Sequence, residues 1–181
     1  MIARILLDVI RNILETFQAK DIPIMLMGGI ATSLWAEPRA TYDIDGVIEI
    51  SFDDLEKILC EVRKKGFTYD KKQPVKFIQG LPFLTLTYPS KGHEIYLDLF
   101  IAKSRYTKEA LSRRQEITFE EVKIPIIAPE DLILYKLISG RSKDLDDVRG
   151  ILLAQEGKLD MEYMKRWAKE LGLLTQLNDE L

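Results

Sequence analysis

Apolar residues recur at helical spacing in the opening segment, and this pattern predicts an amphipathic helix that ends before Pro23. Its apolar stripe consists of Ile2, Ile5, Leu6, Val9, Ile10, Ile13, Leu14 and Phe17. The apolar run 22–27 follows and ends in Gly28-Gly29, and residues 30–35 suit a second helix. The paired glycines therefore stand at a predicted turn from a strand into a helix.

Alternating apolar and polar positions predict strands farther along the chain. In 43–50, Asp43 and Asp45 share one face and the apolar residues the other, because successive side chains in a strand point to opposite faces. In 94–101, Asp98 lies on the face opposite the apolar set. A carboxylate in the middle of a strand that reads as buried is costly without a charged partner. Shorter strands are predicted at 76–78, 83–88 and 122–127.

Helical patterns occupy most of the remaining chain. They are predicted at 52–65, 107–114, 129–140, 145–155 and 161–171. Ser51 can cap the first of these helices, and Gly140 can end the third. The elements together predict an α/β (α+β) fold, with a mixed sheet flanked by helices in residues 1–127. A C-terminal helical subdomain, residues 128–181, is expected to pack on this core as part of a single compact unit.

Composition limits the class of protein. The chain has 181 residues, 46% of them hydrophobic, which is enough for one well-formed core. The single cysteine, Cys60, cannot form an intrachain disulfide and is expected to be buried by packing. Such cysteine usage favours a reducing, cytoplasmic setting. No apolar run reaches the roughly 18 residues of a membrane span, so no membrane association is expected.

The charge pattern argues against a general nucleic-acid coat, because the net charge is −3 and such binding rests mainly on phosphate neutralisation. Local basic clusters could still line a groove for a second substrate, or could equally be solvated faces of loops and helices. Their members are Lys71, Lys72, Lys76, Lys103, Arg105, Lys108, Arg113 and Arg114.

The glycine pair and the two aspartates suggest a phosphate-handling, metal-binding site. A strand-to-helix turn aims backbone N–H groups and the positive end of a helix outward, and glycine leaves room for a phosphate to approach. Asp43 and Asp45 repel each other unless a cation lies between them. Their oxygen atoms suit Mg²⁺, with Mn²⁺ as the alternative. A calcium loop fits poorly, because the further oxygen ligands and the terminal glutamate of such a loop are missing.

These motifs resemble the nucleotidyltransferase superfamily that includes DNA polymerase β and the aminoglycoside nucleotidyltransferases. There, a glycine turn opens a helix and an Asp-x-Asp on the next strand binds two metal ions. The Arg-x-Thr-x-Asp-x-Asp form, here Arg39, Thr41, Asp43 and Asp45, is most similar to the AbiEii and MenT type toxins and their uncharacterised relatives.

Two later segments extend the resemblance. The family carries a third carboxylate on a later strand, which Asp98 matches. Residues 136–148 are similar to a downstream element in which a helix lysine, here Lys136, reaches the nucleotide's phosphates and a Lys-Asp-x-x-Asp segment follows.

The resemblance implies a metal-dependent nucleotidyltransferase that moves a nucleoside monophosphate from an NTP, such as ATP, to an acceptor hydroxyl with release of pyrophosphate. It implies Asp43, Asp45 and Asp98 as catalytic residues and as ligands of Mg²⁺. The nucleotide-binding residues it implies are Gly28, Gly29, Ser33, Arg39, Thr41, Lys136 and Arg141. Acceptors in the similar families include tRNA ends, protein side chains and small antibiotics, and the sequence does not choose among them. The most specific role that the resemblance implies is a toxin of a toxin–antitoxin or phage-defence pair, with a cognate antitoxin as partner.

Simpler interpretations stay open. Gly28-Gly29 could be an ordinary turn, Arg39 and Thr41 could pair or cap locally, and Lys136 could be a surface lysine. The whole chain could be a catalytically silent module that binds a nucleotide or a partner on the same fold. It could also be a structural partner that associates through its opening helix or through residues 171–181.

Overall fold

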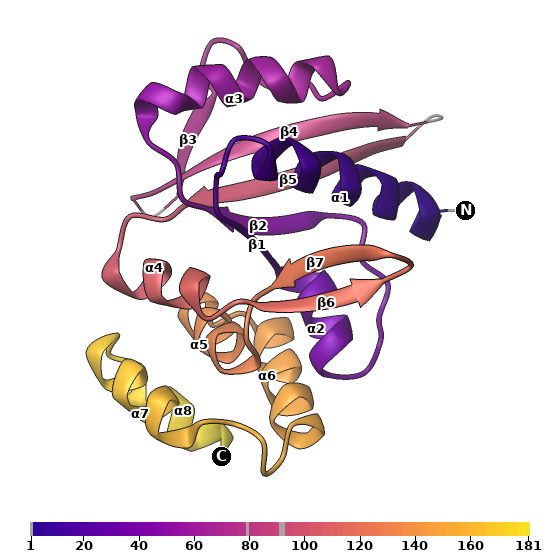
Figure 1. The fold of residues 1–181 in the computed structure, drawn as a ribbon. Coiled ribbons are helices and arrows are strands. Elements are labelled where there is room, and N and C mark those ends of the chain that lie inside the picture. Colours follow the sequence, from indigo (N-terminus) through magenta and orange to yellow (C-terminus); the bar gives the residue numbers. More distant parts are fainter. Residues whose placement is uncertain (1, 79, 91–92) are drawn as a thin grey trace.

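A computed structural model describes residues 2–78, 80–90 and 93–181 of the chain. Within these ranges the protein forms one seven-stranded mixed sheet with helices around it, which confirms the predicted α/β class (Figure 1). The strands are β1 (Ile24–Met27), β2 (Ile44–Ile48), β3 (Val75–Ile78), β4 (Leu81–Ser90), β5 (His93–Ile101), β6 (Gln115–Phe119) and β7 (Val122–Ile126). The helices are α1 (Ile2–Gln18), α2 (Gly28–Trp35), α3 (Phe52–Lys64), α4 (Arg105–Ser112), α5 (Pro129–Ser139), α6 (Ser142–Ala154), α7 (Met161–Glu170) and α8 (Leu174–Glu180).

The strand order brings distant segments side by side. Across the sheet it is β3-β4-β5-β2-β1-β7-β6. Strand β2 pairs antiparallel with β1 on one side and parallel with β5 on the other. The strand that carries Asp45 therefore lies next to the strand that carries Asp98.

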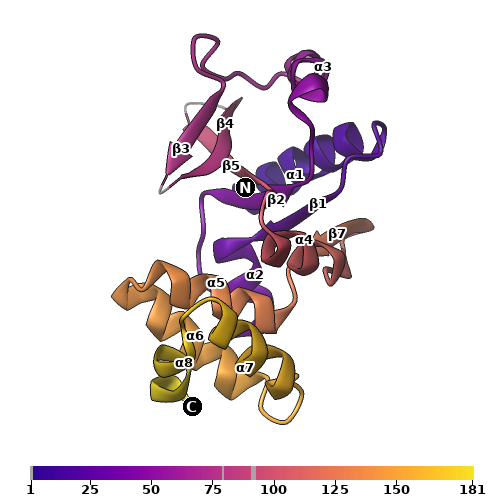
Figure 2. The same cartoon turned by 90° about the vertical axis from the view of Figure 1, so that its left-hand side faces the viewer.

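The two faces of the β4–β5 pair differ in burial. Leu84, Leu86, Leu97 and Leu99 are almost fully buried on one face. Thr85 and its neighbours on the other face are only half-buried or exposed. Figure 2 shows α1 and α3 on one side of the strands and α5 to α8 together on the other. Burial of the leucine face fixes the register, since a slip by one residue would turn these leucines to solvent.

Local signals in the sequence explain several helix boundaries. Ser51 caps α3, because its hydroxyl accepts a hydrogen bond from the backbone N–H of Asp54 at 3.1 Å. Pro129 opens α5, where the missing N–H costs nothing. Gly140 ends α5 in the left-handed conformation with φ of 62°, which glycine adopts without steric cost.

The C-terminal helices are tied to the rest of the chain by a buried carboxylate. Asp131, in the first turn of α5, is fully buried. It accepts hydrogen bonds from Arg113 Nε at 3.2 Å and from the Tyr163 hydroxyl at 2.7 Å. Burial raises the pKa of Asp131, and the bonds from Tyr163 and Arg113 oppose that rise. The three residues connect the end of α4, the start of α5 and the start of α7.

The structure corrects the sequence analysis at three points. Strand β6 was not predicted, because its residues are mostly polar and exposed and the turn after it is formed by Glu120 and Glu121 rather than by glycine. Helix α8 was missed as well, since Leu177 is its only fully buried residue. The expectation that Cys60 is buried is wrong, because it lies on the solvent side of α3. No helix in the described part of the chain is long and apolar enough to cross a membrane.

Candidate active site

A row of three polar side chains crosses strands β2, β5 and β4 on the more open face of the sheet. Asp45 of β2 is paired with Met27 of β1 on one side and with Asp98 of β5 on the other, and Asp98 is paired with Thr85 of β4. Residues paired across neighbouring strands point to the same face. Thr85 Oγ1 donates a hydrogen bond to Asp98 Oδ1 at 2.7 Å. Thr85 was not among the predicted site residues, although alternation along its strand could have identified it.

The glycine pair makes room for side chains of the following segment. Gly28 is the first residue of α2 and has a φ of 63°. A Cβ atom added there would overlap the carboxylate of Asp45, and one added at Gly29 would lie 2.5 Å from Thr41 Oγ1. The first turn of α2 has no side-chain cap. The glycines therefore allow Asp45 and Thr41 to approach an uncapped helix N-terminus. This is more than the role of glycines in an ordinary turn.

Asp45 stands at the centre of opposing charges. Burial, the charge of Asp98 and the charge of Asp43 raise its pKa, while Lys136 and Arg141 lower it. Asp43 lies just before β2 rather than within it and is exposed. Thus three carboxylates are near one another, and two of the predicted cations are close enough to influence them.

Lys136 is a buried residue, so the surface interpretation is wrong. Only 6% of its side chain is exposed. Its Nζ donates to Asp147 Oδ2 at 2.6 Å and to Asp144 Oδ1 at 3.3 Å. Arg39 converges on the same acid, because its NH2 group donates to Asp147 Oδ2 at 3.0 Å. The two acids belong to the predicted Lys-Asp-x-x-Asp segment, but they were not themselves predicted as site residues.

The remaining predicted residues surround this cluster. Arg141 Nε donates to Asp144 Oδ2 at 2.6 Å, and 76% of its side chain is exposed. The Ser33 hydroxyl contacts the carbonyl oxygens of Gly29 and Arg39, both at 3.0 Å, and accepts a weaker bond from the Arg39 N–H. Ser33 thus fixes the backbone around Arg39. Its hydroxyl already has protein partners, so its predicted contact with nucleotide would require it to exchange them.

Carboxylates are suitable ligands for a metal ion, but those of the described residues do not form a complete coordination site in this structure. Within residues 2–78, 80–90 and 93–181, no group of three or more His, Cys, Asp or Glu side chains is already placed to hold a metal ion. Burial raises the pKa of Asp45 most, and the negative charges of Asp98 and Asp43 raise it further; a cation between the carboxylates would offset these charges. Carboxylate oxygens are also the ligands that Mg²⁺ prefers.

Several members of the basic clusters have intramolecular partners. Arg113 contacts Asp131 and Glu130 and stacks over the ring of Tyr163, with its guanidinium carbon 3.7 Å from the ring centroid. Arg105 and Lys108 form surface ion pairs with Glu170 and Glu49. These contacts favour a structural role for this part of the basic surface.

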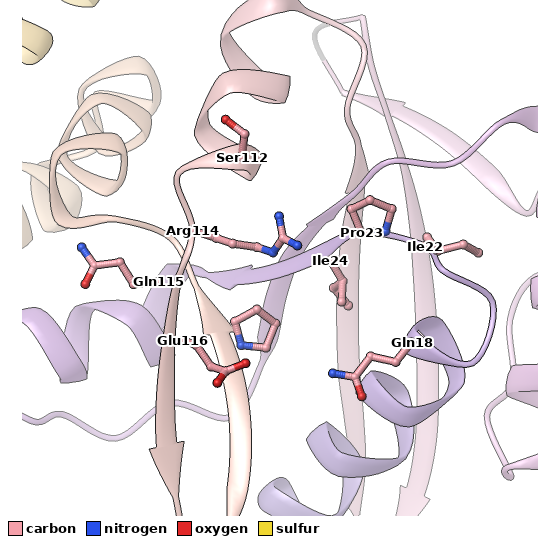
Figure 3. Close-up of a pocket in the computed structure, with 9 residues that line it drawn as sticks. Gln18, Ile22, Pro23, Ile24, Ser112, Arg114, Gln115 and Glu116 are labelled. Atoms are coloured by element: carbon pink, nitrogen blue, oxygen red, sulfur yellow. The ribbon is translucent and has the colours of Figure 1, made fainter.

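A hollow of about 350 Å³ lies at the opposite end of β1 from Gly28. Figure 3 shows it between the end of α1, the start of β1 and the residues that follow α4, with the Arg114 side chain pointing into it. Its polar lining residues are exposed, and none of them belongs to the row of carboxylates. The hollow is therefore separate from the candidate active site.

The C-terminal part of the chain matches a known protein family. Residues 104–180 match the model of a family described as "Nucleotidyltransferase of unknown function (DUF6036)". No curated protein sequence matches the chain.

Solved structures resemble the chain over most of its length. The antibiotic-resistance factor ANT(2'')-Ia has a TM-score of 0.59 and 14% identity, and the match covers 96% of this chain and 97% of that one. A nucleotidyltransferase-like protein from Paracoccidioides brasiliensis has a TM-score of 0.52 and 18% identity, with 93% and 89% covered. The lincomycin-bound lincosamide antibiotic adenylyltransferase LnuA has a TM-score of 0.51 and 18% identity, with 77% and 91% covered.

The chain therefore has the nucleotidyltransferase fold, and the predicted resemblance to that superfamily is confirmed. None of these matches bears on the similarity to the AbiEii and MenT type toxins, which stays a prediction.

Proposed function

We propose that the protein is a metal-dependent nucleotidyltransferase that transfers a nucleoside monophosphate from an NTP to an acceptor hydroxyl. The observation that carries the proposal is the pairing of Asp45 with Asp98 across adjacent strands, beside the uncapped start of α2 at Gly28. Cations and a helix N-terminus on one side of the carboxylates suit a triphosphate. The half-buried strand face on the other side leaves access for an acceptor.

The positions of the charged side chains suggest how the transfer reaction would proceed. The acceptor oxygen attacks the α-phosphorus, a new P–O bond forms, and the bond from that phosphorus to the bridging oxygen breaks, so that pyrophosphate leaves with the electron pair. Asp98 takes the proton of the acceptor hydroxyl, and the bond from Thr85 holds the carboxylate in place. Arg39, Lys136 and Arg141 neutralise the negative charge that accumulates on pyrophosphate.

Asp43, Asp45 and Asp98 would hold Mg²⁺. Bound metal ions would activate the attacking oxygen and screen the triphosphate, as in other two-metal sites. The N–H groups at the start of α2 would bind phosphate oxygens, with Gly29 and Thr41 shaping the approach.

ATP and small hydroxylated molecules form the first substrates to test. One of the similar structures is a lincosamide antibiotic adenylyltransferase with lincomycin bound, and another is ANT(2'')-Ia in complex with adenylyl-2''-tobramycin. A tRNA or protein acceptor, and a toxin role with a cognate antitoxin in the cytoplasm, rest on the motif resemblance alone. Growth arrest on expression of the parent, but not of Asp45→Asn, would support the toxin role.

The test of the proposal is pyrophosphate release with Mg²⁺ and each labelled NTP in turn, against small hydroxylated molecules, tRNA, protein extract and no acceptor. We expect one NTP to give Mg²⁺-dependent release that falls by roughly 100-fold or more in Asp45→Asn. Asp146→Asn is the matched control, because the Asp146 side chain is 75% exposed and, among the described residues, its one ion pair is with Arg149. Nucleotide binding without any transfer would favour the silent binding module instead.

A further inference from the structure

We infer that Asp147 is a positioning residue for the triphosphate, because it holds the side chains of Arg39 and Lys136 in one place. The inference rests on the proposed function, since it concerns how the phosphate side of that site is organised. No substrate atom needs to touch Asp147 itself. It acts through the two cations that contact it.

Two cations from different parts of the chain converge on one oxygen atom. Lys136 comes from α5 and Arg39 from the segment between α2 and β2, and both donate to Asp147 Oδ2, at 2.6 and 3.0 Å. Only 6% of the Lys136 side chain and 10% of the Asp147 side chain are exposed. The Lys136–Asp147 pair, with so little solvent contact, keeps its geometry better than surface pairs, which are mobile and screened. The Arg39 side chain is 29% exposed, so its pair with Asp147 is partly open to solvent.

The backbone around this pair is fixed independently. Ser33 bonds to both the N–H and the carbonyl oxygen of Arg39. Helix α6, which carries Asp147, is held against the end of α2, because Gln155 Nε2 donates to the Trp35 carbonyl oxygen at 2.9 Å. The carboxylate of Asp147 therefore lies on a helix, α6, that is docked on α2, and it contacts Arg39 in a loop whose backbone is fixed by Ser33.

The cation pair still has unused capacity for an anion. Two positive groups around one carboxylate oxygen repel each other, and a second anion relieves that repulsion. Asp144 contacts Lys136 at 3.3 Å but is shared with Arg141 and Ser139. The Nε of Arg39 is buried and has no hydrogen-bond partner within the described part of the chain. A phosphate oxygen supplies both the missing charge and an acceptor.

Asp147 could act in two opposite ways, and they predict opposite results. If it only neutralises the cations, its removal frees two positive charges and tightens phosphate binding. If it positions them, its removal lets both side chains relax apart and weakens binding. The fixed backbone on both sides of the contact favours positioning, because a mere counter-ion needs no docked helix or tied loop.

The experiment measures tripolyphosphate binding to Asp147→Ala, Asp147→Asn and the parent by titration calorimetry without metal or acceptor. We expect Asp147→Ala to bind roughly 10- to 100-fold more weakly, the range seen when a group that orients a binding residue is removed. Asp147→Asn keeps an acceptor oxygen and should lie between the two. It also serves where the alanine variant fails to fold. Affinity that is unchanged or tighter in the variants that fold overturns the inference.

Kinetics separate positioning from a general loss of structure. The KM for NTP should rise in Asp147→Asn while the KM for the acceptor stays that of the parent, and Asp146→Asn on the same helix should change neither. In the double variant Arg39→Ala with Asp147→Asn, the loss of tripolyphosphate affinity should be smaller than the sum of the two single losses, because only Lys136 is then left for Asp147 to position. Additive losses would show that Asp147 does not act through Arg39. Tripolyphosphate binding by a parent that transfers no nucleotide would contradict the proposed function and leave the positioning role intact.

Discussion

Asp45→Asn is the most informative single substitution, because it keeps the size of the side chain and removes one of the crowded negative charges. Adjacent strands lie about 4.8 Å apart, so the backbones of the paired residues Asp45 and Asp98 are about 5 Å from each other, and the same separation is taken for their charges. At an effective dielectric constant of about 20, two unit charges at that distance repel by about 3 kcal/mol. Lys136 and Arg141 offset part of this repulsion, and solvent screens more of it.

The ligand-free variant should therefore be more stable than the parent by about 1 kcal/mol, which corresponds to a rise in melting temperature of about 2 to 4 °C for a chain of this size. The parent should respond to Mg²⁺ and NTP. At a hundred times the dissociation constant the gain is about 2.7 kcal/mol, or about 5 to 10 °C. Asp45→Asn should lose most of that response together with transfer activity.

Thermal melting with and without Mg²⁺ and ATP, alone and combined, measures both effects in one series. The control is Asp146→Asn, which removes the same charge from an exposed position. A full response of Asp45→Asn to Mg²⁺ and nucleotide would refute the assignment of Asp45 to the metal site. A ligand-free variant less stable than the parent would show that the neighbouring cations outweigh the carboxylates, contrary to the reasoning above.

Three further predictions concern stability. Gly28→Ala should cost about 1 to 3 kcal/mol in urea denaturation, because the new Cβ overlaps Asp45 and φ is 63°; Gly157→Ala, with φ of 74° and no atom nearby, measures the backbone cost alone. Asp131→Asn should cost about 2 to 3 kcal/mol, less than a fully buried pair because Arg113 is partly exposed, while kcat per folded molecule stays that of the parent. Burial opposes ionisation of Asp144, but bonds from Arg141 and Ser139 and the charge of Lys136 lower its pKa below 3.8. Its contribution is therefore present above pH 3.8 and lost as pH falls through the lowered value, so acid unfolding should depend less on pH below 3.8 in Asp144→Asn than in the parent.

The sequence predicted the elements whose pattern is set by local burial. The strand at 94–101 alternates because one face packs against the core, and the structure has β5 at His93–Ile101. Ser51, Pro129 and Gly140 marked helix ends because each acts through its own backbone. Strand β6 was not predicted from the sequence, because it lies at the edge of the sheet and its residues form no apolar face.

The partners of the site residues could not be read from the sequence. Strand order places Asp98 beside Asp45, but periodicity indicates only which face each one occupies. The pairing of Arg39 with Asp147 spans 108 positions and depends on how α6 docks against the end of α2. Lys136 looked like a surface lysine or a phosphate ligand, and no local signal showed that two acids one helical turn apart would bury it.

The two groups of charges are held by different kinds of structure, and this affects how each responds to substitution. Asp45 and Asp98 are placed by the backbone ladder of β2 and β5, so their separation changes little when nearby side chains are altered. Lys136 and Arg39 are long side chains whose ends are placed by Asp147 rather than by the backbone. Substitutions on α6 should therefore disturb the phosphate side of the site first. The carboxylates should be disturbed mainly by changes within the sheet. Thr85→Val is a mild example, because it replaces only the hydroxyl that donates to Asp98 with a methyl group.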